Sequence, residues 1–132
     1  MTTARETFVV DTHALVWYLT DDKKLSAKAA SLIEQSERGG VKMVIPTIVL
    51  AELLTIVEKK RVPLAMTTVL DWMIACPGVL VSPLDLLVFA EMLRMGQGLE
   101  LHDRIIAATA NQYAVHVITR DPALSAAVRT VW

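Results

Sequence analysis

The chain has 132 residues, of which 54% are hydrophobic and 20% are charged, and its formal net charge at pH 7 is −1. This length predicts a single domain over residues 1–132, and this composition excludes an intrinsically disordered chain. The charge balance counts against a passive electrostatic binder of nucleic acid, but not against an enzyme that holds phosphates through a bound cation.

Short apolar runs typical of strands alternate with longer helical patterns along the chain. Strands are predicted at residues 7–10, 41–45, 79–81 and 116–119, with a final edge strand at 129–132. Helices are predicted at residues 13–19, 26–39, 47–60, 63–75, 82–96, 103–113 and from 121 onward. Apolar strands that alternate with helices indicate a parallel sheet covered on both faces. We therefore expect an α/β fold, a three-layer α/β/α sandwich with a mainly parallel central sheet of four or five strands.

Three helix starts are predicted from local signals. Pro63 fits the first turn of its helix, because proline is favoured there. The segment from Ser82 to Asp85 is similar to a capping box. Asp103 fits the N-cap of the helix that follows it, because aspartate is a common N-cap residue.

Composition also indicates where the protein works and what surrounds it. No segment is long and apolar enough to span a bilayer, and residues 1–6 lack the apolar core of a secretory signal. The single cysteine, Cys76, follows apolar residues and predicts a buried free thiol, which fits a reducing cytoplasm. Because charged residues are scarce, we expect exposed apolar surface, and hence a homo-oligomer or a bound partner.

Two acidic residues follow predicted strands. Asp11 comes directly after Phe8-Val9-Val10, and Asp121 comes directly before Pro122. Taken singly, each is explained as a helix N-cap. In a parallel sheet, however, both lie at the carboxyl edge, where ligands bind.

Glu52 lies on an apolar helical stripe. The positions three and four residues away hold no lysine or arginine, although burying a carboxylate is costly unless something compensates its charge. Two interpretations stay open. Glu52 lies at the edge of the stripe and reaches water or Lys59, or it faces a ligand.

Together these acids indicate more than any one of them does alone. Asp11 and Asp121 at strand ends, and Glu52 and Asp103 on adjoining helices, can converge at one edge of the sheet. Two carboxylates about 4 Å apart repel by about 4 kcal/mol at an effective dielectric near 20. A divalent cation would relieve this repulsion, and oxygen ligands select Mg²⁺ or Mn²⁺ over Zn²⁺. The three histidines lack the short spacing of a metal site.

Four segments that contain these acids occur in a characteristic order. They are FVVDTHALVW (8–17), VLAEL (49–53), LHDRIIAATA (101–110) and VITRD (117–121). No single segment is specific, but the ordered set resembles the four motifs of PIN domains, most closely those of VapC toxins of type II toxin–antitoxin pairs. The resemblance covers essentially the whole chain.

The resemblance implies a metal-dependent endoribonuclease of PIN-like fold. By motif, Asp11, Glu52, Asp103 and Asp121 are the catalytic acids that hold Mg²⁺ or Mn²⁺, and Thr119 is the hydroxyl beside the last acid. An ion held by these carboxylates would bind the scissile phosphate, orient a water and stabilise the departing 3′-oxygen. A carboxylate free of metal, Asp103 or Asp121, accepts the proton of the water.

Other contacts follow from the resemblance or are left open. Arg104 and Arg120 either hold substrate phosphate or are solvated, and Val49 stands where family members often carry serine. The resemblance also implies an RNA substrate, a VapB-like antitoxin and a homodimer. Five large side chains in helical patterns are expected to pack in the core or, alternatively, to line a groove for an antitoxin segment: Trp17, Tyr18, Trp72, Met92 and Met95.

Rival functions stay in view. One is a PIN nuclease of RNA processing or decay without an antitoxin, and another is a non-catalytic interaction module. A dehalogenase-like or receiver fold also gathers acids at strand ends. The dehalogenase motif requires an aspartate where this chain has His13. The receiver pattern requires paired early acids and a late lysine, and neither appears in this chain.

Overall fold

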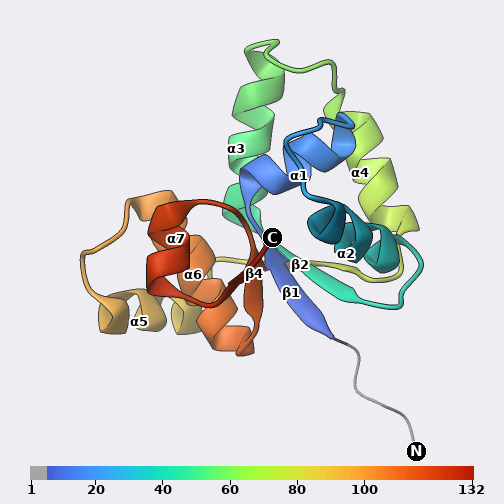
Figure 1. Cartoon of the computed structure of the whole chain (residues 1–132). Coiled ribbons are helices and arrows are strands. Elements are labelled where there is room, and N and C mark those ends of the chain that lie inside the picture. The colour runs from blue at the N-terminus through green and yellow to red at the C-terminus, as the bar shows by residue number, and fades with distance from the viewer. Residues whose placement is uncertain (1–5) are drawn as a thin grey trace, which may run out of the picture.

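The computed structural model describes residues 6–132, and this range contains five strands and seven helices (Figure 1). In chain order they are β1 (Thr7–Val10), α1 (Thr12–Leu19), α2 (Ala27–Glu37), β2 (Lys42–Pro46), α3 (Thr47–Glu58), α4 (Met66–Ala75), β3 (Val79–Ser82), α5 (Leu86–Met95), α6 (Leu101–Tyr113), β4 (His116–Ile118), α7 (Pro122–Ala127) and β5 (Thr130–Val131).

The strands form one sheet in the order β3-β2-β1-β4-β5, and every pairing is parallel. The chain runs outward from β1 through β2 to β3 and then returns to β4 on the other side of β1. This reversal places a topological switch point between β1 and β4, where Val10 is in register with Ile118. Ligands of open parallel sheets bind beyond the strand ends at such a point.

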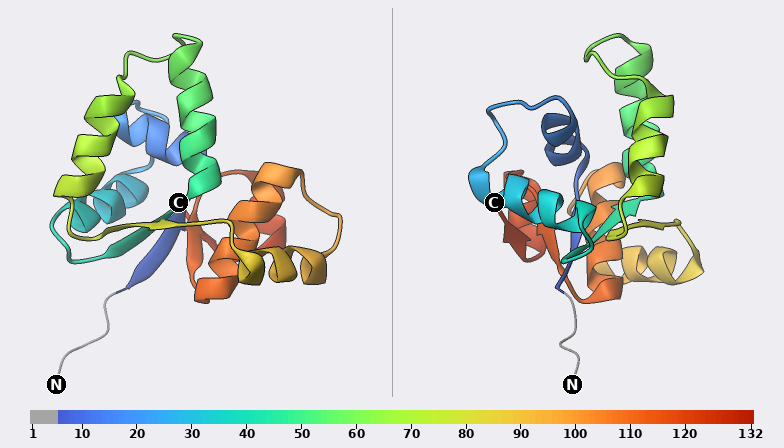
Figure 2. Two further views of the ribbon diagram at one scale, coloured as in Figure 1. Left: turned by 180° about the vertical axis from the view of Figure 1, so that it is seen from behind. Right: turned by 90° about the vertical axis from the view of Figure 1, so that its right-hand side faces the viewer.

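Helices cover both faces of the sheet, which confirms the predicted three-layer α/β/α architecture. The right-hand view of Figure 2 shows α1, α2 and α7 on one side of the strands and α5 and α6 on the other. Helix α6 contacts β1, β2 and β4, and α5 packs on α6 rather than on the sheet. Helices α3 and α4 project beyond the carboxyl ends of the strands (Figure 2, left).

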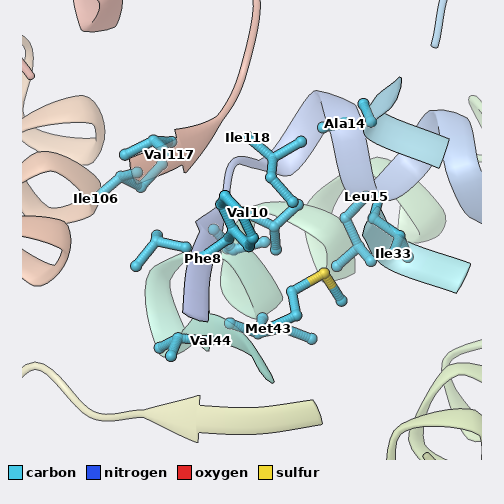
Figure 3. Close-up of a cluster of buried hydrophobic side chains, with 14 of the residues drawn as sticks. Phe8, Val10, Ala14, Leu15, Ile33, Met43, Val44, Ile106, Val117 and Ile118 are labelled. Carbon is cyan, nitrogen blue, oxygen red and sulfur yellow. The ribbon is translucent and has the colours of Figure 1, made fainter. Parts of the chain in front are cut away.

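The central strands are buried on both faces, as their continuously apolar sequences predict. Val9, Val44 and Val117 have no exposed surface. Figure 3 shows Leu15 of α1 beside Ile33 of α2, and Ile106 of α6 beside Val117 of β4. The core therefore anchors β1 and β4, whose ends carry Asp11 and Thr119.

A second link between helices is polar. Tyr18 Oη of α1 donates a hydrogen bond to Glu37 Oε1 at the end of α2, and Trp72 Nε1 of α4 donates to Glu37 Oε2 (2.6 Å). Burial and the hydrogen bond to Glu37 raise the pKa of the Tyr18 phenol. Glu37 thus ties α4 to the two helices beneath it.

The structure settles part of the prediction for the other large side chains. Met92 is buried, and Trp17 and Met95 are half-buried against the core. Cys76 is buried, as predicted. Among residues 6–132, none of the helices has the length and hydrophobicity needed to cross a bilayer.

Two predicted helix starts on the β3 side are wrong. Helix α4 begins at Met66, after an extended Ala65, because the Leu64 N–H turns back to Val62 O (3.0 Å) and takes Pro63 into a loop. Helix α5 begins at Leu86. Its N-cap is Asp85, which accepts from the Val88 N–H (2.9 Å), whereas Ser82 belongs to β3.

The predicted N-cap role of Asp103 is also wrong. Helix α6 begins two residues earlier, at Leu101, with Glu100 at the N-cap. Asp103 therefore lies in the first turn, where the positive end of the helix dipole favours an acidic side chain. The carboxylate of Asp103 is left free for another role.

Candidate active site

Asp11 and Thr119 meet at the switch point of the sheet. The Asp11 N–H donates to Ile118 O (3.2 Å), which continues the pairing of β1 with β4 by one step. Thr119 Oγ1 donates to Asp11 Oδ2 and accepts from the Asp121 N–H (3.0 Å). Asp11 and Thr119 are 6% and 1% exposed, so this buried threonine joins a buried acid to the backbone of a half-buried one.

Asp11 and Asp121 are both helix N-caps, as predicted for each of them singly. Asp11 Oδ1 accepts from the Ala14 N–H and Asp121 Oδ1 accepts from the Ala123 N–H, each at 2.8 Å. Capping uses one oxygen of each carboxylate. In Asp121 the other oxygen stays available to a ligand, whereas in Asp11 the other oxygen also accepts from Thr119 Oγ1 and could meet a ligand only through its second lone pair.

Glu52 is oriented by two neighbours that sequence reasoning missed. Its Oε1 accepts from Thr12 Oγ1 of α1 (3.0 Å), and its Oε2 lies 3.4 Å from His102 Nδ1 of α6. The Glu52 side chain is 26% exposed. Of the two open interpretations, the structure favours a side chain turned toward the other acidic segments. The sequence offered one clue to these two neighbours: Thr12 directly follows the predicted acid Asp11, and His102 directly precedes the predicted acid Asp103.

The carboxylate of Asp103 is repelled by all three other acids. Burial is the largest cause that raises the pKa of Asp103, and repulsion from Asp121, Glu52, Glu100 and Asp11 adds to it. The structure therefore brings the four predicted acids into one electrostatic neighbourhood, although they come from four different segments.

Burial also raises the pKa of Asp11. Hydrogen bonds from Thr119 and from the Ala14 N–H oppose this rise, as does the charge of His13, whereas Asp121 adds to it. The protein thus holds a buried carboxyl whose charged form is disfavoured. Such perturbed carboxyl groups in a cleft mark functional sites.

A cavity of about 330 Å³ adjoins the acids. Its lining residues are Asp11, His13, Trp17, Arg120, Asp121, Pro122 and Trp132. Arg120 Cζ lies 4.5 Å from the centroid of the Trp17 ring, so the predicted substrate-binding side chain lies at this cavity.

Arg104, the second predicted substrate-binding residue, makes a different contact. Its Nε and Nη2 donate to Met92 O at 2.9 and 2.6 Å, near the end of α5. This arginine is neither fully solvated nor bound to an acid of the cluster in this structure. Its predicted contact with phosphate stays a prediction.

The donor set fits a hard cation by its chemistry. All four acids offer carboxylate oxygens, and burial, to which repulsion from neighbouring acids adds, raises the pKa of both Asp11 and Asp103. Among residues 6–132, no three His, Cys, Asp or Glu side chains are arranged as the ligand set of a metal ion. The acids therefore gather without forming a complete coordination sphere.

Comparison with known proteins identifies the family. The PIN-domain model matches residues 8–129, so the chain belongs to the PIN-domain family. This range includes all four acids. No curated protein sequence matches the chain.

Solved structures share the fold over most of the chain. VapBC2 from Rickettsia felis, bound to a DNA fragment from its promoter, is 15% identical over 95% of this chain and 96% of that one, with a TM-score of 0.67. FitAcB from Neisseria gonorrhoeae is 20% identical over 95% and 96%, with a TM-score of 0.64. A toxin–antitoxin complex from Klebsiella pneumoniae is 19% identical over 86% of each chain, with a TM-score of 0.60.

Proposed function

We propose that this protein is a Mg²⁺- or Mn²⁺-dependent endoribonuclease and the toxin of a type II toxin–antitoxin pair. The observation that carries this proposal is the geometry at the switch point, where Thr119 Oγ1 joins the Asp11 carboxylate to the Asp121 backbone and Thr12, next to Asp11, holds Glu52. A cluster of four acids is stable when a cation offsets their repulsion. Membership of the PIN-domain family supports nuclease chemistry at this cluster.

The four acids would hold the ion, and their neighbours fix them for that task. Thr119 and the Ala14 N–H hold Asp11, and Thr12 holds Glu52. When bound, a divalent ion supplies positive charge to the scissile phosphate and to the departing 3′-oxygen. Asp103 or Asp121 would accept a proton from water, and the raised pKa of Asp103 makes it a stronger base than an ordinary aspartate.

The two arginines would have different roles. Arg120 borders the cavity beside Asp121, and we expect its guanidinium to bind an RNA phosphate. Arg104 donates hydrogen bonds to Met92 O, and we expect these bonds to fix α6 against α5 and thereby to position Asp103.

Protein partners are part of the proposal. The three structural relatives belong to the VapBC, FitAcB and toxin–antitoxin complexes, which supports an antitoxin partner of the VapB type. The predicted exposed apolar surface is present around β3 and α5, at Leu80, Val81, Leu84, Leu86, Leu87, Phe89 and Leu93. This surface supports association, and we propose a homodimer. The cytoplasm is the compartment that such a toxin and its RNA substrate share.

A PIN nuclease that acts without an antitoxin would use the same acids. Co-expression with the product of a neighbouring short gene separates the two functions. A toxin co-purifies with that product and loses its activity, whereas an RNA-processing nuclease does neither. An interaction module without catalysis would show no RNA cleavage at all.

The direct test is cleavage of single-stranded RNA by the purified, partner-free protein. With Mg²⁺ or Mn²⁺ the wild type should cut, and Asp11→Asn should lose the activity. Asp71→Asn, which removes an exposed acid of α4, is the matched control and should cut as the wild type does. Equal cleavage by the wild type and Asp11→Asn would mean a contaminating nuclease and would contradict the proposal.

A further inference from the structure

We infer that the cavity beside Asp11 and Asp121 binds one unstacked base of single-stranded RNA next to the bond that is cut. This inference rests on the proposed ribonuclease function and adds the part of the substrate that positions it. The cavity has a volume of about 330 Å³, within the usual range of small-ligand sites, about 300–1,000 Å³.

Aromatic rings form the apolar wall of this cavity. The rings of Trp17 and Trp132 lie 5.9 Å apart at 73°, and those of His13 and Trp17 lie 5.8 Å apart at 46°. Both tryptophans are half-buried and His13 is exposed, so ring surface remains accessible in the cavity. Bases of single-stranded nucleic acid bind proteins by stacking on such rings.

Two cations lie over the same indole ring. Arg120 Cζ is 4.5 Å and Lys24 Nζ is 5.7 Å from the Trp17 centroid. They place positive charge beside the aromatic wall, where the phosphates flanking a stacked base would run.

The topology links this cavity to the reaction centre. His13 and Trp17 lie on α1, directly after Asp11, and Arg120 directly precedes Asp121. Trp132 follows β5, the strand beside β4. A base held here is therefore attached to a phosphate close to the acids, whereas a duplex would need to release that base first.

A scan with abasic nucleotides tests the inference. Single-stranded oligoribonucleotides, each lacking one base, are bound to Asp11→Asn protein, which should not cut them. One position should weaken binding by about five- to hundredfold, the effect of losing a single stacked base. Adding Trp17→Leu or Trp132→Leu should weaken binding of intact RNA similarly and abolish the sensitivity to that position.

The matched control is Tyr113→Ala, which removes an exposed aromatic ring at the far end of α6 and should leave the scan unchanged. Thermal unfolding checks that each variant folds. If both tryptophan variants unfold, His13→Ala replaces them, because this exposed ring lines the same cavity beside Trp17 and should likewise abolish the sensitivity.

The outcomes separate this inference from the proposed function. If wild-type protein cuts RNA but no abasic position matters, or if both tryptophan variants keep the sensitivity, the base site is wrong and the nuclease stands. If the tryptophan variants instead lose only a co-purifying protein partner, the cavity is a protein-docking site and the inference fails. If wild-type protein never cuts RNA, the proposed function fails first.

Discussion

Thr119 donates a hydrogen bond to Asp11 from 108 positions along the chain, and it accepts one from the backbone of Asp121. One buried hydroxyl therefore joins the acid that follows β1 to the acid that follows β4. Because these strands are neighbours at the switch point, this contact assembles the candidate active site from two distant parts of the sequence.

Removing this hydroxyl should weaken the protein. Thr119→Val leaves buried polar groups of Asp11 and Asp121 without a partner, so we expect the free energy of unfolding to fall by about 1–3 kcal/mol. The pKa of Asp11 should rise further, because the lost hydrogen bond lowers it. Urea unfolding and NMR titration measure these effects. Thr68→Val, at an exposed site on α4, is the control and should change stability by about 0.5 kcal/mol or less.

The raised pKa of Asp11 predicts a pH dependence of stability in metal-free protein. The folded pKa lies above the ordinary value of 3.8, so the folded state binds more protons than the unfolded state. Stability contributed by this group is therefore lost as the pH rises from about 4 through the folded pKa. Asp11→Asn removes the charge, and its stability relative to the wild type should increase over this window. Urea midpoints in EDTA that stay a constant distance apart would contradict the assignment.

Divalent cations should stabilise the folded protein. An ion that binds only the folded state adds about 2.7 kcal/mol at a hundred times its dissociation constant. Mg²⁺ or Mn²⁺ should therefore raise the melting temperature of the wild type and of Asp71→Asn. Asp11→Asn and Glu52→Gln should respond weakly or not at all. A response of equal size in all four proteins would indicate an ion bound elsewhere.

Arg104 is expected to stabilise the fold rather than to bind RNA. Arg104→Ala removes two hydrogen bonds to Met92 O and should lower the free energy of unfolding by about 1.5–3 kcal/mol, the range for bonds to charged groups. Arg38→Ala, which removes an exposed partner of Glu34, should cost less than about 1 kcal/mol. RNA affinity should fall for Arg120→Ala but not for Arg104→Ala. The reverse order would restore Arg104 as the phosphate contact.

The carboxylate of Glu37 is expected to hold α4 in place. Glu37→Ala leaves Tyr18 and Trp72 without their shared acceptor, and we expect a loss of about 1.5–3 kcal/mol in urea unfolding. A double-mutant cycle with Trp72→Phe tests the contact directly, since the two losses should not add. The control, Glu34→Ala, removes an exposed acid of the same helix and should change stability by less than about 1 kcal/mol.

Local patterns predicted much of this structure. The apolar runs located the strands, and the residues that follow them placed Asp11 and Asp121 at helix N-caps. These predictions succeeded because a strand end and a cap are decided by a few neighbouring residues. The start of α6 was missed because Asp103 is by type a better N-cap than Glu100, whose side chain makes no capping hydrogen bond, so the local preference did not decide where this helix begins.

Contacts between segments that are distant in the sequence could not be predicted from such local patterns. The partners of Glu52 are Thr12 and His102, which reach it only because α3 packs against both α1 and α6. The ring pair of Trp17 and Trp132 likewise joins α1 to the residue after β5. The order of motifs predicted which acids belong together, but the walls of the cavity depend on tertiary structure.

Because the switch point joins two distant parts of the chain, the candidate active site can form only after both parts have been translated. Asp11 emerges from the ribosome 108 residues before Thr119, and Asp121 follows Thr119. A nascent chain that stops before β4 has neither the hydroxyl that holds Asp11 nor the fourth acid. On the proposed function, we expect such an incomplete chain to be inactive toward the messenger from which it is being translated.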